Sequence, residues 1–277
     1  MRLHRDWSGH DPRPKGTRAP WRRPRNPLIP ILLCLGFLGC ASTLPSPSYP
    51  TSRFVLHTES SPDEAEAIIR GSEAFLSDLE EYLGLEAPPP GQFMIVHFRR
   101  RWDLWSYLGK ELPELRWRKG ACFETSQAYV LALSGRPGKE CFQRILRHEL
   151  SHFCLASHFS DFPPWIDEGL SQVLSDGPPF PDPGAANASA SPTLPEASSE
   201  AEACLELLRA EPGQMLTRSQ YELARRITLW LLLASEDSIQ RLLRFLEISG
   251  PDRESREVFL DAWGMSFEDA CSATIKR

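Results

Sequence analysis

The sequence lacks the features that would identify several common classes of protein. It has no glycine-rich phosphate loop, no dinucleotide-binding fingerprint and no serine nucleophile elbow, so nothing points to those three kinds of chemistry. The apolar run 28–39 is only twelve residues long, whereas a membrane-spanning helix needs about 20 residues. The 7 cysteines include no C-x-x-C pair, which argues against a zinc site built from thiolates.

Basic residues are scarce outside the N-terminus. Residues 1–27 hold eight Arg or Lys and two Asp, and no charged residue lies between 28 and 40. The chain from Cys40 onward therefore holds 23 basic and 35 acidic residues, a formal charge of −12. Such an acidic body argues against nucleic acid as a partner, because phosphate binding needs a basic surface. With 41% hydrophobic and 25% charged residues, the composition is globular and excludes a disordered chain, a coiled coil or a polytopic membrane protein.

The N-terminus predicts export. Basic residues followed by a short apolar run and small residues are typical of a secretory signal peptide. The run ends in Phe37-Leu38-Gly39-Cys40-Ala41-Ser42, which resembles a bacterial lipoprotein box, in which the cysteine is lipidated and becomes the new N-terminus. We expect a signal peptide over 1–40, lipidation of Cys40 and a Ser/Thr/Pro tether over 41–52; an uncleaved anchor is the alternative. Either way, we expect the protein in the bacterial cell envelope, held at a membrane and facing the periplasm or exterior.

Beyond Cys40 the number of cysteines is odd. With five thiols, at most two disulfides can form and one thiol stays free. No spacing identifies the pairs among Cys122, Cys141, Cys154, Cys204 and Cys271.

Hydrophobic periodicity predicts an α+β fold. Alternating or buried apolar runs predict strands over 53–58, 93–98 and 126–133, and helical spacing predicts helices over about 61–83, 102–111, 140–157 and 165–174. Residues 177–200 form a low-complexity loop, either a lid or a disordered insertion. The rest is expected to be helical, over about 201–210, 216–234, 237–248, 253–263 and 266–276. We therefore expect one domain over 53–277, with an α/β part over 53–175 and a helical C-terminal subdomain over 201–277.

The stretch His148-Glu149-Leu150-Ser151-His152 carries the chemistry. On a helix, the two histidines are four residues apart and lie on one face, where their imidazoles can hold one zinc ion. Glu149 would then stand beside the metal, where its carboxylate can take a proton from a water molecule. A catalytic zinc also needs a third protein ligand and an open fourth position.

Two downstream residues could supply the third ligand. His158 follows His152 at the spacing of the metzincin zinc motif, but that motif needs a glycine where this chain has Leu155. With leucine there the helix can continue, and His158 would point about 120° away from His152. Glu168 lies on a second predicted helix, which begins after the Pro163-Pro164 break and can present its carboxylate to the histidines. We favour Glu168 and keep His158 as the alternative.

The stretch from Pro164 to Leu170 (PWIDEGL), together with the histidine motif, resembles the gluzincin class of zinc metallopeptidases in the peptidase MA clan. More closely, it resembles bacterial peptidase-MA-like proteins, including an uncharacterised family. The match is specific over about 126–175 and looser over 53–125 and 201–277. It implies a zincin-like fold, with a small mixed sheet and an active-site helix. It also implies one Zn²⁺ per chain, held by His148, His152 and Glu168, with Glu149 as general base.

The resemblance implies further roles. Relatives often use a Tyr or His from a later helix to stabilise the oxyanion, and Tyr221 is the best-placed candidate; a half-buried structural tyrosine is the alternative. Zincins also hold peptide substrate along an edge strand just before the metal helix. Here that strand would be 126–133, with Ala128, Tyr129 and Val130 contacting the substrate.

Neighbours of the proposed ligands carry weaker expectations. Asp161 and Asp167 could orient a ligand imidazole, but Asp161 is expected in a loop, and Asp167 should point elsewhere if Glu168 faces the zinc. Thermolysin-like relatives have an acidic residue four positions after the third ligand, where this chain has Gln172. This difference weakens the transfer of their detailed mechanism.

The leading hypothesis is a lipid-anchored zinc metallopeptidase that hydrolyses peptide or protein substrates outside the cytoplasm. One alternative is a non-catalytic binding or scaffold lipoprotein with the same fold; another is a metzincin-like peptidase that uses His158. Glu149 argues against the scaffold, because a structural zinc site does not need this carboxylate.

Overall fold

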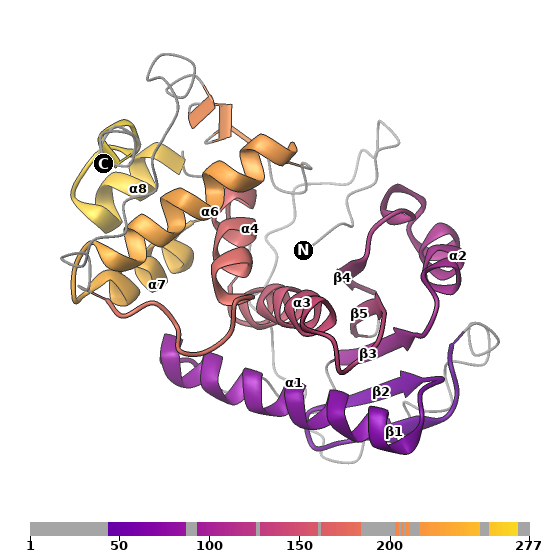
Figure 1. The fold of residues 1–277 in the computed structure, drawn as a ribbon. Coiled ribbons are helices and arrows are strands. Elements are labelled where there is room, and N and C mark those ends of the chain that lie inside the picture. Colours follow the sequence, from indigo (N-terminus) through magenta and orange to yellow (C-terminus); the bar gives the residue numbers. More distant parts are fainter. Residues whose placement is uncertain are drawn as a thin grey trace, which may run out of the picture.

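The computed structural model describes residues 44–86, 93–125, 128–159, 162–183, 203–204, 206–207, 209–210, 216–249 and 255–270. The expected signal peptide with Cys40, Cys271, Asp161 and most of the loop 177–200 lie outside the described residues. Within them the protein is α+β, with one small mixed sheet and several helices, as the sequence predicts (Figure 1).

The sheet has five strands in the order β1-β2-β3-β5-β4. Its centre is parallel: β2 (Phe54–Thr58), β3 (Phe93–Phe98) and β5 (Tyr129–Ser134) run in the same direction. Both outer strands, β1 (Ser48–Pro50) and β4 (Gly120–Glu124), pair antiparallel with their neighbours. The three predicted strands are therefore confirmed, whereas β1 and β4 were not predicted.

These two outer strands correct two expectations. Part of the predicted tether is structured, since Ser48 lies opposite His57 in the β1–β2 pair; the tether prediction is wrong for residues 48–50. The predicted edge strand is not an edge, since β5 is paired with β3 on one side and β4 on the other. Tyr129 and Val130 are paired on both sides, and the backbone groups of Ala128, just before β5, bond to Thr125. These three residues therefore do not form a free edge, and β4 takes that place.

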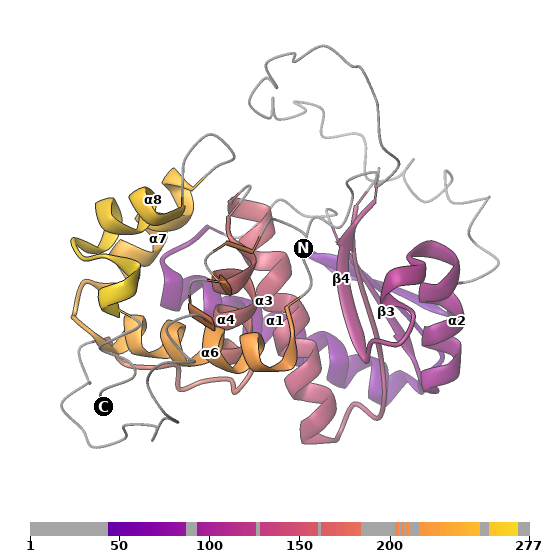
Figure 2. The same cartoon turned by 90° about the horizontal axis from the view of Figure 1, so that it is seen from above.

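Helices cover the two faces of the sheet. One face packs on α1 (Pro62–Leu83) and α3 (Glu140–His158), and the other packs on α2 (Arg101–Glu111), which lies apart from them in both views (Figures 1 and 2). The sequence marks the ends of α1 clearly. Ser61 and Glu64 form a reciprocal capping box at its start, and Gly84 ends it with φ 66°, a left-handed conformation that glycine adopts without strain.

The C-terminal helices share the core of the α1 face. The helix α4 (Pro164–Leu174) packs on α6 (Arg218–Leu233), followed by α7 (Ser238–Ile248) and α8 (Ser255–Trp263). Trp165 of α4 is fully buried, with Phe267 at 5.1 Å and Phe245 at 5.9 Å between ring centroids. This aromatic contact fixes the start of α4, just before the candidate ligand Glu168.

Two further points concern the expected location and cysteines. No helix within the described ranges is long and apolar enough to cross a bilayer. Cys122, Cys141 and Cys154 carry free thiols, so these three cysteines take part in no disulfide.

Candidate metal centre

The helix α3 presents both histidines of the motif toward α4. Apolar residues such as Leu146, Leu150 and Phe153 bury one side of α3 in the core, which fixes the rotation of the helix. His148 and His152 then lie one turn apart with their rings nearly perpendicular, at 88°, and their Nε2 atoms 3.1 Å apart.

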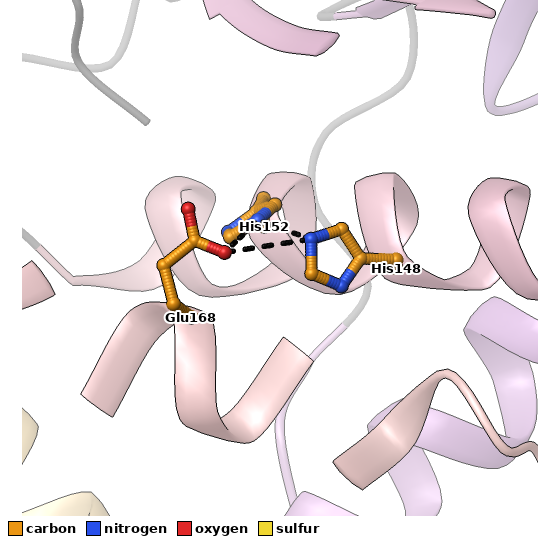
Figure 3. A group of neighbouring side chains, drawn as sticks. All are labelled: His148, His152 and Glu168. Carbon is orange, nitrogen blue, oxygen red and sulfur yellow. Dashed lines mark hydrogen bonds and ion pairs between the residues drawn. The ribbon is translucent and has the colours of Figure 1, made fainter. Parts of the chain in front are cut away.

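Glu168 completes the group from the second helix. The chain reverses before α4, which begins at Pro164, where the missing N–H of proline costs no helical hydrogen bond. Glu168 Oε2 lies 3.5 Å from His148 Nε2 and 3.6 Å from His152 Nε2 (Figure 3). Among the described residues, these three side chains form the one cluster of His, Cys, Asp or Glu that could hold a metal ion.

The spacing of the three atoms fits a small tetrahedral cation. Tetrahedral zinc with bonds of about 2.0–2.1 Å would separate neighbouring ligand atoms by about 3.3 Å, close to the separations of 3.1, 3.5 and 3.6 Å found here. Glu168 Oε2 is buried and has no hydrogen-bond partner. A buried carboxylate oxygen left without a donor is costly, and a bound cation would satisfy it.

Asp167 also belongs to the site, which corrects the expectation that it points elsewhere. Its Oδ1 accepts a hydrogen bond from His152 Nδ1 at 2.7 Å, and Ser171 Oγ lies 3.1 Å from the same nitrogen. Because a carboxylate can only accept, Nδ1 carries the proton. When the imidazole is neutral, the lone pair of Nε2 faces His148 and Glu168.

The charges of the site are tightly coupled. Burial disfavours a charged His152, but the carboxylates of Asp167 and Glu168 outweigh burial and raise the pKa of His152 to about 10. Burial would raise the pKa of Glu168, yet His152 and His148 hold that pKa well below its usual range. The site therefore stabilises positive charge between its carboxylates, and a metal cation can take the place of the proton.

Glu149 lines the same pocket as the three candidate ligands. Burial raises the pKa of its carboxyl, although the two histidines oppose the shift. Glycine at position 120 makes room for this side chain: a Cβ there would lie 2.8 Å from Glu149 Oε1 and 2.7 Å from Ile145 Cγ2. Gly120 thus allows β4 to pass close beside α3.

Tyr221, at the start of α6, also lines the pocket. Its hydroxyl donates to Glu168 Oε1 at 3.0 Å and accepts a hydrogen bond from Arg118 Nη2 at 3.4 Å. Burial, reinforced by Glu168, raises the pKa of Tyr221, so the hydroxyl keeps its proton. In this arrangement Tyr221 positions the carboxylate of Glu168; its oxyanion role stays a prediction.

The alternative ligand His158 lies elsewhere. Its Nδ1 is 2.8 Å from the carbonyl oxygen of Cys154 and its Nε2 is 2.6 Å from that of Glu86. The reason is the one the sequence suggests, since α3 runs without a break through Leu155 to His158. Gln172 does not contact a ligand imidazole through its amide nitrogen, which donates to the carbonyl oxygen of Tyr221 at 3.4 Å.

Sequence reasoning missed two residues of this site, Gly120 and Arg118. It named Asp167 as a possible partner of a ligand imidazole but expected its side chain to point elsewhere. Gly120 begins β4 and Arg118 lies just before it, and this strand was not predicted. Their only signal is a glycine and a basic residue just before an apolar run.

Comparisons with known proteins add no family assignment. No model of a known protein family matches the chain, and no curated protein matches it significantly.

Proposed function

We propose that this chain is a zinc-dependent metallopeptidase that hydrolyses peptide bonds. One observation carries the proposal. The ligand atoms of His148, His152 and Glu168 are separated by the distances expected between ligands of a tetrahedral zinc ion, and the Glu149 carboxylate lines the same pocket. A structural metal site would not need the Glu149 carboxylate, which is not one of the three ligands.

The donor set favours zinc over other common cations. Two imidazole nitrogens and one carboxylate oxygen suit Zn²⁺, whereas Mg²⁺ and Ca²⁺ prefer oxygen ligands alone. Three protein ligands with an open fourth position are typical of catalytic sites. When bound, zinc would act as a Lewis acid that polarises a carbonyl group and lowers the pKa of water.

The residues around the ligands have distinct tasks in this proposal. Glu149 takes a proton from the attacking water and passes it to the leaving amine, and its raised pKa strengthens it as a base. Asp167 holds the imidazole of His152 in the tautomer that leaves Nε2 free. Arg118 and Tyr221 place a guanidinium group and a hydroxyl at the pocket wall. The guanidinium can donate to a substrate oxygen, and the hydroxyl can do so when it turns away from Glu168.

The outer strand β4 suits an extended peptide. It forms the edge of the sheet, and its residues Gly120, Ala121 and Cys122 line the pocket. A substrate that adds to this edge as a further strand would pass directly over the candidate ligands. We propose that β4, and not β5, binds the substrate backbone.

The proposed place of action is the bacterial cell envelope. The support is the lipoprotein-box-like sequence around Cys40, and lipidation there would hold the domain at a membrane. Mass determination of the protein purified from membranes would test this point, since lipidation adds acyl groups at Cys40 and cleavage of the Gly39–Cys40 bond removes residues 1–39.

Metal content tests the site directly. We expect the full chain to bind about one zinc per molecule by elemental analysis, to lose it in Glu168→Ala and to keep it in His158→Ala. Zinc lost only in His158→Ala would favour the metzincin-like alternative. A folded wild type that binds no zinc, even when zinc is supplied, would refute the proposal.

Glu149→Gln separates an enzyme from a scaffold. The amide has the size of the carboxylate but cannot accept the proton, so hydrolysis in a peptide-library screen should vanish while zinc stays bound. If the zinc-loaded wild type shows no more hydrolysis than Glu149→Gln across the library, the non-catalytic scaffold is the better account.

A further inference from the structure

A cluster of tryptophan and arginine side chains lies on the outer side of α2 and of the segment that follows it. Trp105 packs edge-on against Trp102 at 5.0 Å and against Trp117 at 4.9 Å between ring centroids. Two guanidinium groups lie over these rings, Arg101 at 5.7 Å from Trp105 and Arg116 at 4.9 Å from Trp117. These five residues are called the Trp–Arg patch below.

The patch exposes unusually large apolar groups. Trp102 is 69% exposed and Trp117 is 62% exposed; in the described part of the chain, the only other large hydrophobic residue so exposed is Leu260, at 51%. A folded chain normally buries indole rings, and neighbouring exposed ones commonly mark an interaction site. The patch is also fixed in place, since Trp105 Nε1 donates to the carbonyl oxygen of Arg118 at 3.1 Å.

Charge identifies the kind of partner. Residues 99–119 hold seven Arg or Lys and three Asp or Glu, a local charge of +4, whereas the body from Cys40 onward carries −12. A basic, aromatic segment on an acidic protein favours an anionic surface. Indoles prefer the boundary between water and lipid, and arginine is attracted to anionic headgroups.

The start of the described chain lies on the same side as the patch. Leu44 packs against the core cluster between α2 and the sheet, which includes Leu104 and Leu108 of α2. Cys40 is four residues earlier, so an extended chain could separate the two residues by at most about 14 Å. A lipid on Cys40 would therefore bring a membrane close to the α2 side of the domain.

We propose that the Trp–Arg patch docks on an anionic phospholipid bilayer and provides a second membrane contact beside the lipid anchor. The inference rests on the proposed lipidation of Cys40 but not on hydrolysis. A second contact fixes the orientation that a single flexible tether would leave free. Because Arg118 follows the patch and lines the pocket, docking would place the pocket near the membrane surface.

Fluorescence quenching tests the docking in the full chain. The protein is reconstituted into vesicles of equal parts phosphatidylglycerol and phosphatidylcholine, with bromine on the acyl chains of the phosphatidylcholine. Bromine in the bilayer should quench tryptophan emission, and Trp102→Phe/Trp117→Phe should lose most of this quenching. Leu260→Ser on α8, far from α2 in both views, is the matched control and should behave as the wild type.

The contribution of the two arginines is measured separately, as a change in the docking constant. Arg101→Gln/Arg116→Gln should lower the docking constant by roughly 30-fold, from about 1 kcal/mol for each basic residue at an anionic surface, and added salt should reduce quenching in the wild type. Equal quenching in wild type and Trp102→Phe/Trp117→Phe would overturn the proposal, as would undiminished quenching in pure phosphatidylcholine. Patch-dependent binding of a single-stranded oligonucleotide, without quenching by vesicles, would overturn it in favour of nucleic acid.

Discussion

Asp167→Asn tests the link between Asp167, His152 and metal affinity. The carboxylate accepts from His152 Nδ1 at 2.7 Å inside the protein, and asparagine keeps its size but removes its charge. Partners of ligating histidines typically contribute tenfold to a hundredfold to metal affinity. We therefore expect the Kd for zinc to rise by roughly 10- to 100-fold, or about 1.4 to 2.7 kcal/mol.

Proton competition partly hides this effect at neutral pH. Because Asp167 and Glu168 raise the pKa of His152, His152 must release a proton before it can bind a metal, and this competition weakens apparent metal binding at neutral pH. Asp167→Asn removes one carboxylate that raises this pKa and so relieves part of the competition. The loss of affinity in the variant should therefore be larger at pH 9 than at pH 7.

Competition with a chromophoric chelator at both pH values measures these affinities. Ser171→Ala is the matched control, because Ser171 Oγ lies 3.1 Å from the same nitrogen but carries no charge; its effect should be several-fold smaller. If the Kd of a folded Asp167→Asn protein stays within twofold of the wild type at pH 9, Asp167 does not support the ligand and this reasoning fails.

Three further predictions follow from the same site. Gly120→Ala should reduce hydrolysis at least tenfold while zinc stays bound, because its Cβ would lie 2.8 Å from Glu149 Oε1; retained turnover would contradict this. Tyr221→Phe should weaken zinc binding severalfold, because Glu168 Oε1 loses its donor at 3.0 Å, and calorimetry measures the change. In metal-stripped protein, His152 stabilises the fold below its unfolded pKa of 6.5, and this contribution is lost as the pH rises through about 10. Glu168 has a lowered pKa, so it stabilises the fold above its unfolded pKa of 4.5, and this stabilisation is lost as the pH falls through its folded pKa. The Tm of metal-stripped protein should therefore peak between about pH 5 and 6.5. A flat profile would contradict these shifts.

The sequence predicts most of the fold where signals are local. The ends of α1 are marked by Ser61, Pro62 and Gly84, and α3 by its apolar spacing, so both helices are found within a residue or two. The strand β1 is missed because it is only 3 residues long, and β4 is missed because its sequence, GACFE, has no β-branched residue. Their strand character comes from pairing with neighbours in the sheet, which periodicity does not reveal.

In the site too, the features with a local sequence signal are predicted and those that depend on tertiary contacts are not. The periodicity of α3 predicts that His148 and His152 face one way, and the proline break predicts a second helix that carries Glu168. The expectation for Asp167 was wrong because neighbouring helical residues point about 100° apart, which suggested that only one of the two could face the site. An imidazole has two nitrogens on different sides of its ring, so His152 contacts Glu168 through Nε2 and Asp167 through Nδ1.

The residue after Glu168 explains how a later helix reaches the site. A Cβ on Gly169 would lie 2.6 Å from the carbonyl oxygen of Ala224 and would also collide with Thr228 Oγ1, so only glycine lets α4 and α6 pack this closely. This close packing brings Tyr221, one turn before Ala224, within hydrogen-bond distance of Glu168. The pair Glu168-Gly169 therefore acts as a unit, in which the first residue offers the ligand and the second admits the helix that holds the ligand in place.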